Sequence, residues 1–140
     1  MKANSITPLF IVDSVHKSIE FYKDILDFKY IMGVDKDKEL YLEYPNSADL
    51  KFAIVQSGNI QIMFQEKNNI SDDLNQSINI DKNIDNSLIY IEIEGFDEYY
   101  EKIKDRVEIV NEPRNTFYGM KEFFMRDNSD NIICFAEKLI

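Results

Sequence analysis

The sequence predicts an α+β fold in which one arrangement of strands and a helix occurs twice. Hydrophobic side chains alternate in short segments, change to helical spacing and alternate again, and this order repeats after residue 86. A polar segment, residues 67–86, separates the two repeats. The chain of 140 residues has the length of one domain, and its 44% apolar content is enough to bury a core. We therefore expect a single domain over residues 1–140, built from two modules.

The first module is predicted over residues 5–66. Residues 5–12 are rich in β-branched and aromatic side chains and predict a strand, and Asp13 is a suitable N-cap for a helix that follows it. Residues 14–26 predict that helix, because their apolar side chains recur on one helical face at Val15, Ile19, Tyr22 and Leu26. Alternation and turn residues then predict strands at residues 28–34, 39–44, 50–56 and 60–65.

The second module is predicted over residues 87–138, after the linker at residues 67–86. The linker is rich in Asn and Asp, and within it only a short helical turn around residues 71–74 is expected. Residues 87–94 predict a strand, because Ile89, Ile91 and Ile93 alternate with side chains of the other face. A helix at residues 97–106 is followed by predicted strands at residues 107–110, 120–126 and 132–137.

The charge balance limits the partners of the protein. The chain has 16 Lys and Arg against 26 Asp and Glu, which gives a net charge of −10. Nucleic acids and anionic membranes repel such an anion, so neither is an expected partner. No segment approaches the ~20 apolar residues that a membrane span needs, and a cytoplasmic location is expected.

The single histidine and the single cysteine limit the chemistry. One histidine excludes a metal site built from several imidazoles, and one cysteine excludes an intramolecular disulfide. His16 is expected on the solvent side of the first helix, beside Glu20 and Lys23. No basic side chain is predicted near Cys134, so we expect a small apolar residue there rather than a nucleophile.

Two stretches of sequence resemble a known family. Residues 11–28 begin Ile-Val-Asp-Ser-Val and end Leu-Asp-Phe, where the family pattern ends Leu-Gly-Phe. Residues 112–135 contain Tyr-Gly-Met and then the turn Asp-Asn-Ser-Asp-Asn, where the family has Asp-Pro-Asp-Gly-Asn. With the repeated order of strand, helix and three strands, the chain resembles the vicinal-oxygen-chelate superfamily of glyoxalases, bleomycin-resistance proteins and extradiol dioxygenases.

The resemblance implies an open, cup-shaped mixed sheet formed by both modules, with helices on the convex face and the ligand in the concave face. The sequence is consistent with two such faces. In residues 60–65, Ile60, Ile62 and Phe64 point to one side, and Met63 between two glutamines points to the other.

The resemblance also identifies the positions where metal-using members carry His or Glu. These positions correspond here to Ile6, Met63, Leu88 and Cys134, and no His, Asp or Glu lies within two residues of any of them. A divalent metal of this family requires imidazole and carboxylate donors. We therefore expect no metal and no other cofactor, and neither metal-dependent glyoxalase nor dioxygenase activity.

Three functions remain open. By resemblance to bleomycin-resistance proteins, the chain is expected to be a homodimer that binds a small cationic or aromatic molecule in the cup without chemistry, as antibiotic-resistance proteins of this kind do. The alternative is a metal-independent isomerase or lyase with Glu92 or Glu122 as general base. The third is a dimeric interaction module whose own side chains fill the cup. The expected ligand-binding residues are Phe10, Phe52, Met63, Tyr90, Glu92, Glu122, Phe124 and Cys134.

Overall fold

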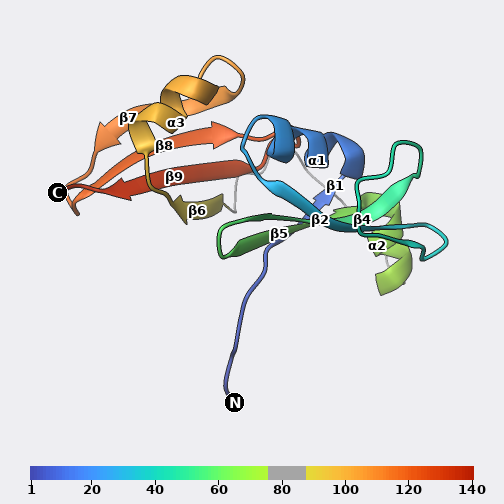
Figure 1. The fold of residues 1–140 in the computed structure, drawn as a ribbon. Helices are drawn as coiled ribbons and strands as arrows, with labels where there is room; N and C mark the ends of the chain where they lie inside the picture. Colours follow the sequence, from blue (N-terminus) through green and yellow to red (C-terminus); the bar gives the residue numbers. More distant parts are fainter. Residues whose placement is uncertain (76–87) are drawn as a thin grey trace. The chain divides into compact units, whose positions relative to one another are not determined.

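The two predicted repeats are two units of structure. The computed structural model describes residues 1–75 and 88–140, and the chain divides into Met1–Ile80 and Asp81–Ile140 (Figure 1). Each unit contains one open mixed sheet, and the described residues form sheets of five and four strands with three helices. The α+β fold class is therefore confirmed. Residues 76–86 of the predicted linker lie outside the described residues.

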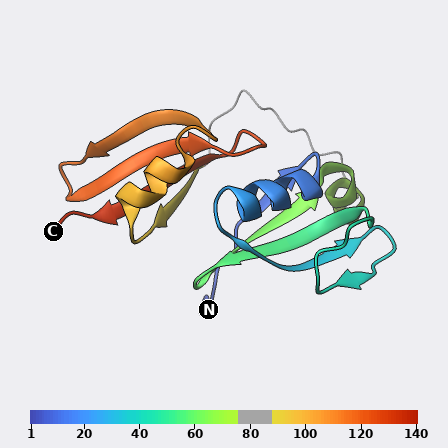
Figure 2. The same ribbon diagram turned by 45° about the horizontal axis from the view of Figure 1, so that its top comes forward.

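The first unit has a parallel pair at one edge of its sheet. Its elements are β1 (Leu9–Val12), α1 (Val15–Asp24), β2 (Lys29–Asp35), β3 (Leu40–Tyr41), β4 (Leu50–Ser57), β5 (Ile60–Glu66) and α2 (Lys67–Leu74). The strand order is β1-β5-β4-β2-β3, in which β1 runs parallel to β5 and the other neighbours are antiparallel (Figure 2). The first strand of the unit thus pairs with its last.

The second unit repeats this topology. Its elements are β6 (Leu88–Glu92), α3 (Phe96–Ile103), β7 (Glu108–Asn115), β8 (Met120–Arg126) and β9 (Ile132–Lys138). The order is β6-β9-β8-β7, and β6 again runs parallel to the last strand, β9. The predicted internal repeat is confirmed, and the short strand β3 is an addition at the edge of the first sheet.

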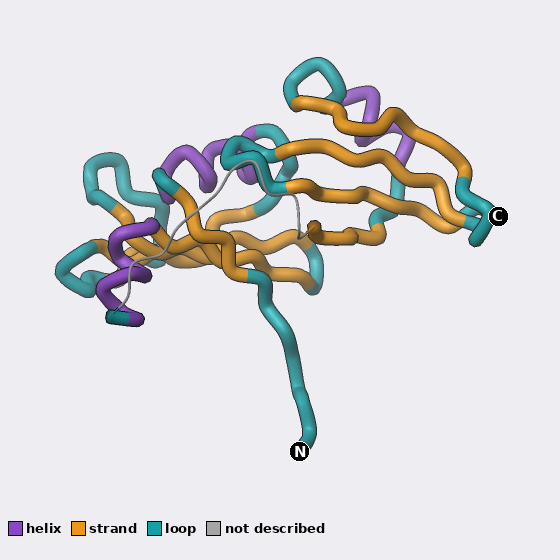
Figure 3. The backbone as a smooth tube through the Cα atoms, turned by 180° about the vertical axis from the view of Figure 1, so that it is seen from behind, coloured by secondary structure: helices purple, strands orange, loops and turns teal. Residues whose placement is uncertain are grey.

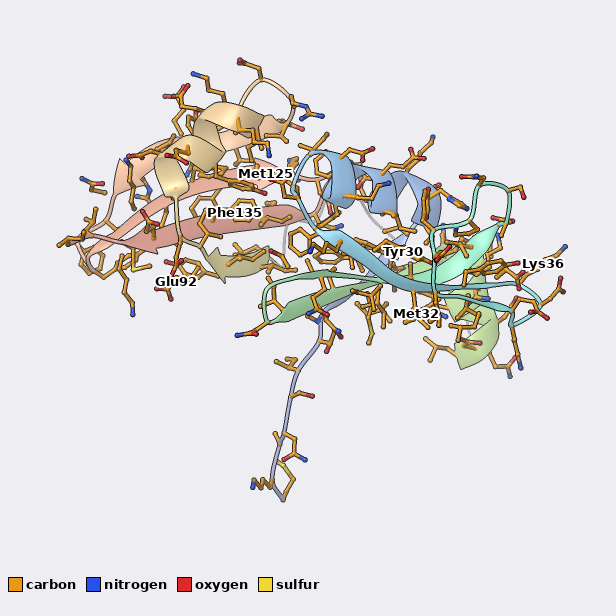
Figure 4. All side chains as sticks on the ribbon, viewed as in Figure 1. Tyr30, Met32, Lys36, Glu92, Met125 and Phe135 are labelled. Carbon is orange, nitrogen blue, oxygen red and sulfur yellow. The ribbon has the colours of Figure 1, made fainter. Side chains whose placement is uncertain are left out.

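Each unit has an aromatic core between one helix and one sheet face. In the first unit, the Tyr22 ring of α1 lies 4.9 Å from the Phe64 ring of β5, and both side chains are buried. In the second unit, Phe96 of α3 lies 5.3 Å from Phe123 of β8 in an edge-to-face contact. Figure 4 shows Phe135 of β9 on the side of its sheet that faces α3. Within residues 88–140, no helix lies on the opposite face of the second sheet.

Several element boundaries differ from the prediction for local reasons. Helix α1 is capped by Ser14, whose hydroxyl accepts from the Lys17 amide, and not by Asp13. Strand β1 begins only at Leu9, and Ile6 is 94% exposed. Strand β7 continues beyond the predicted residue 110, because β7 is an edge strand and Pro113 there removes no N–H that a second neighbour needs.

The linker carries a helix on the face opposite α1. Glu66 caps α2 by accepting hydrogen bonds from the amides of Asn68 and Asn69. Gln65 alternates with Phe64 and therefore points away from α1, and its amide donates to Asn69 and to Asp73 of α2. Figure 3 shows α1 and α2 on opposite sides of the first sheet. The segment predicted as a linker therefore adds a helix on the other face of the first sheet.

Two aspartates stand where the family pattern has glycine, and both have the backbone that favours glycine. Asp27 has φ 63° and Asp130 has φ 65°. Asp is one of the few residues that adopts this left-handed conformation at modest cost. In the β8–β9 turn, Asp127 accepts from the amides of Ser129 and Asn131 and so keeps the hairpin closed without the family's Pro and Gly.

No helix among residues 1–75 and 88–140 is long and apolar enough to cross a membrane.

Candidate functional site

The face of the second sheet opposite α3 gathers five of the eight residues expected from the sequence. In the strand register Tyr90 lies opposite Cys134, and Cys134 lies opposite Phe124. In the next row of this face, Glu92 lies opposite Ala136, and Ala136 lies opposite Glu122. Figure 4 shows Glu92 extending on the side of the sheet away from α3. We call this surface, formed by Tyr90, Glu92, Glu122, Phe124 and Cys134, the open face.

A buried carboxylate lies in the open face. Glu122 is only 1% exposed. The Tyr90 hydroxyl donates to its Oε2 atom at 2.5 Å. The Tyr118 hydroxyl lies 2.7 Å from Oε1 and 2.8 Å from Oε2, and Arg114 Nη2 lies 4.0 Å from Oε1. We call Tyr90, Arg114, Tyr118, Glu122 and Cys134 the Glu122 cluster.

The turn between β7 and β8 brings Tyr118 to the carboxylate. Gly119 has φ 82°, a conformation that L side chains rarely adopt, and its amide donates to the Thr116 carbonyl. Thr116 and Met120 close the turn through their amides and the Thr116 hydroxyl. Tyr118 therefore folds back over β8 onto Glu122, four residues further along, and the neighbouring Phe117 side chain is fully exposed.

The environment keeps the phenols and the thiol of the cluster protonated at neutral pH. Loss of hydration at its hydroxyl, followed by the hydrogen bond to Glu122, raises the pKa of Tyr90. The hydrogen bond to Glu122, followed by desolvation, raises the pKa of Tyr118. Burial raises the pKa of Cys134 to about 12; the Glu122 charge adds to this shift and Arg114 opposes it. Cys134 is therefore a buried thiol rather than a thiolate nucleophile.

The cluster has two chemical capacities. A carboxylate can accept about four hydrogen bonds, and within residues 1–75 and 88–140 Glu122 accepts from two hydroxyls and faces one guanidinium at 4.0 Å. It can therefore accept further donors or a proton. Burial of a charge is costly, and buried carboxylates with specific partners are concentrated at functional sites, although structural networks contain them too.

The residue types at the family's metal positions do not fit a divalent metal. Ile6 and Leu88 carry no donor atom and are exposed, Met63 offers a thioether, and the Cys134 thiol remains protonated. In residues 1–75 and 88–140, no three His, Cys, Asp or Glu side chains are grouped so that they could hold a metal ion.

The other expected residues lie elsewhere. Phe10 pairs in register with Phe64 and its ring stacks at 6.4 Å on the ring of Phe64, so it points towards the α1 side and its assignment to the concave face is wrong. Phe52 and Met63 alternate with Ala53 and Phe64 and lie on the other face of the first sheet. Glu92 lies in the open face, but its side chain is 53% exposed and 3.7 Å from Lys138, outside the Glu122 cluster.

Sequence reasoning missed Tyr118 and Arg114. Tyr118 lies in a predicted connection, and its contact with Glu122 depends on the turn that Gly119 permits. The available signal was the spacing of four residues from Tyr118 to Glu122 across a glycine-containing hairpin turn. Arg114 lies in the part of β7 that was not predicted as strand.

His16 is half-buried, and the expectation of an exposed surface histidine is wrong. Its Nδ1 atom lies 2.8 Å from the Tyr44 hydroxyl and its Nε2 atom 2.5 Å from the Ala48 carbonyl oxygen. The chain between β3 and β4 thus folds back onto α1, a tertiary contact that helical spacing does not reveal. A pocket of about 490 Å³ lies there, lined by His16, Glu20, Tyr44, Pro45, Asn46, Ser47, Ala48 and Asp49.

Comparison with known proteins agrees with the fold. Residues 3–135 match the model of a family described as the Glyoxalase/Bleomycin resistance protein/Dioxygenase superfamily. A search of curated protein sequences found no match.

Solved structures with low sequence identity share the architecture. A protein of unknown function from Agrobacterium tumefaciens has a TM-score of 0.75 at 19% identity, with 99% of this chain and 97% of that chain covered. A glyoxalase/bleomycin resistance protein/dioxygenase from Nocardioides gives 0.73 at 11%, covering 99% and 85%. The bleomycin-binding protein of Streptomyces verticillus, complexed with copper(II)-bleomycin, gives 0.61 at 19%, covering 96% of each chain. At these identities the likeness shows the fold alone.

Proposed function

Because this chain belongs to the Glyoxalase/Bleomycin resistance protein/Dioxygenase superfamily, we propose that it binds a small cationic or aromatic molecule on the open face, without metal. One observation carries the proposal: Glu122 is a buried carboxylate on the sheet face opposite α3. A buried charge on such a face is expensive for a purely structural residue. A ligand that lies against the same face can pair with this carboxylate through a hydrogen bond or an opposite charge.

The surroundings of Glu122 support a ligand of this kind. Tyr90, Phe124 and Tyr118 offer aromatic surface, and Glu122 offers one charged acceptor among them. Binding sites for small molecules combine apolar walls with a few polar groups that fix orientation. The net charge of −10 favours the approach of a cation over distance. The similar fold of the protein solved with copper(II)-bleomycin supports binding as a function that this architecture can serve.

Thermal denaturation with a panel of small aromatic compounds tests the proposal. The panel contains cationic, neutral and anionic members of similar size. A compound present at 100 times its Kd should raise the free energy of unfolding by about 2.7 kcal/mol. Glu122→Gln should reduce this stabilisation, whereas Glu98→Gln, which removes the same charge from the exposed surface of α3, should not. The proposal fails if no compound stabilises the protein, or if both variants respond alike.

Metal independence needs its own measurement. The residue types at Ile6, Met63, Leu88 and Cys134 support it, because they include neither imidazole nor carboxylate. We expect added Ni²⁺, Zn²⁺ or Mn²⁺ to leave the melting temperature unchanged, and elemental analysis to find less than a stoichiometric amount of metal. One tightly bound metal per chain would contradict this part of the proposal.

A second candidate is a metal-independent isomerase or lyase with Glu122 as general base. It is favoured by the burial of Glu122 and by the Tyr90 hydroxyl at 2.5 Å, which could return a proton to the substrate. Hydrogen exchange at carbon next to a carbonyl group, followed in D₂O by NMR with small ketones and thioesters, measures such proton removal. Exchange that is fast in the native protein and lost in Glu122→Gln supports the enzyme. Equal exchange in both proteins would exclude Glu122 as a general base and leave binding as the supported function.

The assembly and the location of the protein are part of the same proposal. Members of the bleomycin-resistance type form homodimers, and we propose the same here, in the cytoplasm. A single buried thiol without a disulfide partner suits a reducing compartment. Sedimentation equilibrium should give twice the chain mass of 16.5 kDa, and a monomer at all concentrations would contradict the dimer.

A further inference from the structure

We infer that the Tyr118 hydroxyl occupies the position that two coplanar N–H groups of a ligand, a planar fork, would take at Glu122. The ligand would carry these groups as an amidinium or guanidinium on an aromatic body. The inference rests on the proposed binding function and specifies the ligand class of the same site. Tyr118 is then a specificity-determining residue that leaves Glu122 when the ligand arrives.

The position of the Tyr118 hydroxyl indicates the shape of the missing group. The hydroxyl oxygen lies 2.7 Å from Oε1 and 2.8 Å from Oε2, so it stands between the two carboxylate oxygens. A hydroxyl has one proton and cannot donate fully to both oxygens. A planar fork of two N–H groups fills this position with two parallel, charge-assisted hydrogen bonds.

Tyr118 is the partner of Glu122 that can be displaced. It lies in the turn between β7 and β8, outside the strand ladder, and 53% of its surface is exposed. Tyr90 instead lies on β6, which is held to β9 by parallel pairing. Displacement of Tyr118 therefore costs its hydrogen bonds to Glu122 and to the Thr116 side chain, and the Tyr90 hydroxyl stays on Oε2 beside the incoming group.

An aromatic surface stands next to the proposed fork position. The Phe117 ring is fully exposed and lies 5.1 Å from the Tyr118 ring in an edge-to-face arrangement. An exposed phenylalanine beside the tyrosine that contacts the carboxylate offers a stacking surface for the body of a ligand whose head group reaches the carboxylate. Together the two features select an aromatic cation rather than a small inorganic one.

The chain's own guanidinium does not fill the position. Arg114 Nη2 remains 4.0 Å from Oε1, and the Arg114 side chain is 57% exposed. Its charge should weaken the binding of a second cation and strengthen the binding of an anion. Removal of the Arg114 charge therefore changes the affinity in opposite directions for the two ligand classes.

Isothermal titration with four phenyl compounds tests the inference. Benzamidinium is the planar fork, benzamide its neutral counterpart, phenyltrimethylammonium a cation without N–H donors, and benzoate an anion. We expect benzamidinium to bind at least tenfold more tightly than the other three. Tyr118→Phe should tighten benzamidinium about tenfold, because no hydrogen bond to the carboxylate has to be broken. Arg114→Gln should tighten it as well, and Glu122→Gln should weaken it at least tenfold.

Each other result overturns the inference in a recognisable way. Weaker benzamidinium binding in Tyr118→Phe would make Tyr118 a ligand contact rather than a placeholder. Tighter binding of benzoate than of benzamidinium, lost in Arg114→Gln, would indicate an anionic ligand group. If Glu122→Gln fails to fold, the tighter benzamidinium binding expected of both Tyr118→Phe and Arg114→Gln still decides the question. Glu122-dependent binding of benzamide or another neutral compound without benzamidinium binding would refute the ligand class and leave the proposed function intact, whereas no binding by any compound would refute both.

Discussion

Replacement of Tyr90 by Phe removes one oxygen atom and should measurably destabilise the protein. The lost hydroxyl donates to Glu122 Oε2 at 2.5 Å, and Glu122 is almost completely shielded from water. A hydrogen bond to a charged group contributes about 1.5–3 kcal/mol. For 140 residues, an unfolding entropy of about 2.1 cal/mol/K per residue converts this loss into a melting-temperature decrease of about 5–10 °C.

The matched control is Tyr100→Phe. Tyr100 lies on α3, its ring packs on Phe123, and its hydroxyl forms no hydrogen bond within the described part of the chain. Both variants are compared by calorimetry and urea denaturation, and a cycle with Glu122→Gln isolates the coupling between Tyr90 and Glu122. If Tyr90→Phe stays within about 0.5 kcal/mol of the control, the bond to Glu122 does not stabilise the fold.

The hydrogen bond between Tyr90 and Glu122 should also make the free energy of unfolding depend on pH in the alkaline range. The pKa of Tyr90 is raised in the folded protein, so the folded state keeps this proton at a pH where the unfolded phenol, with an ordinary pKa near 10, has released it. The stabilisation is therefore complete below about pH 10 and is lost as the pH rises above that value. The difference in stability between the native protein and Tyr90→Phe should shrink over this range.

Three further predictions concern other parts of the chain. Gly33→Ala should lower the free energy of unfolding by about 1–3 kcal/mol in urea titrations, because the new methyl group would stand 2.7 Å from the Tyr30 hydroxyl and 2.8 Å from a Leu50 methyl. The Cys134 thiol, fully buried and with its pKa raised to about 12, should escape iodoacetamide at pH 8 until urea unfolds the chain, as read by mass spectrometry. His16→Ala should destabilise by about 1–3 kcal/mol and speed amide hydrogen exchange in residues 42–49.

These predictions have clear contrary results. A Gly33→Ala protein as stable as the native chain would mean that Tyr30 and Leu50 can move apart without cost. Rapid alkylation of Cys134 in the native state would contradict the burial of its side chain. Unchanged exchange in residues 42–49 of His16→Ala would show that other contacts hold this segment against α1.

The periodicity of hydrophobic residues and the residues typical of turns predicted most of the architecture, because each strand of a module buries one of its faces. The alternation of Ile89 and Ile91 with Tyr90 and Glu92 identified the two faces of β6 before any pairing was known. The order of strands and helix, repeated twice, was enough to predict the α+β class and the internal repeat. Both properties depend on local sequence, which a single chain displays directly.

The failures concern features that depend on contacts between distant residues. The side on which Phe10 lies follows from its register with β5, and neither strand states this register in its own sequence. His16 looks solvent-facing on the helix, and only the return of residues 42–49 half-buries it. Helix α2 lacks a strong apolar stripe and depends on its Glu66 cap and on the contacts of Gln65.

The candidate site was predicted in part for the same reason. Glu122 and Tyr90 belong to regular strands, so the alternation of side chains along each strand was enough to predict that both lie on one face. Tyr118 belongs to a turn whose geometry depends on Gly119, and Arg114 lies in an extension of β7 that breaks the expected pattern at Pro113. Strand periodicity gives no information about side chains of this kind.

Chemical-shift mapping tests the binding site at Glu122 most directly. The uniformly ¹⁵N- and ¹³C-labelled protein is titrated with the panel compound that stabilises it most. The largest shifts are expected at Tyr90, Glu122, Phe124 and Cys134, and they should be lost in Glu122→Gln but kept in Glu98→Gln. Shifts confined to the pocket beside His16, or the same shifts in both variants, would contradict a ligand site at Glu122.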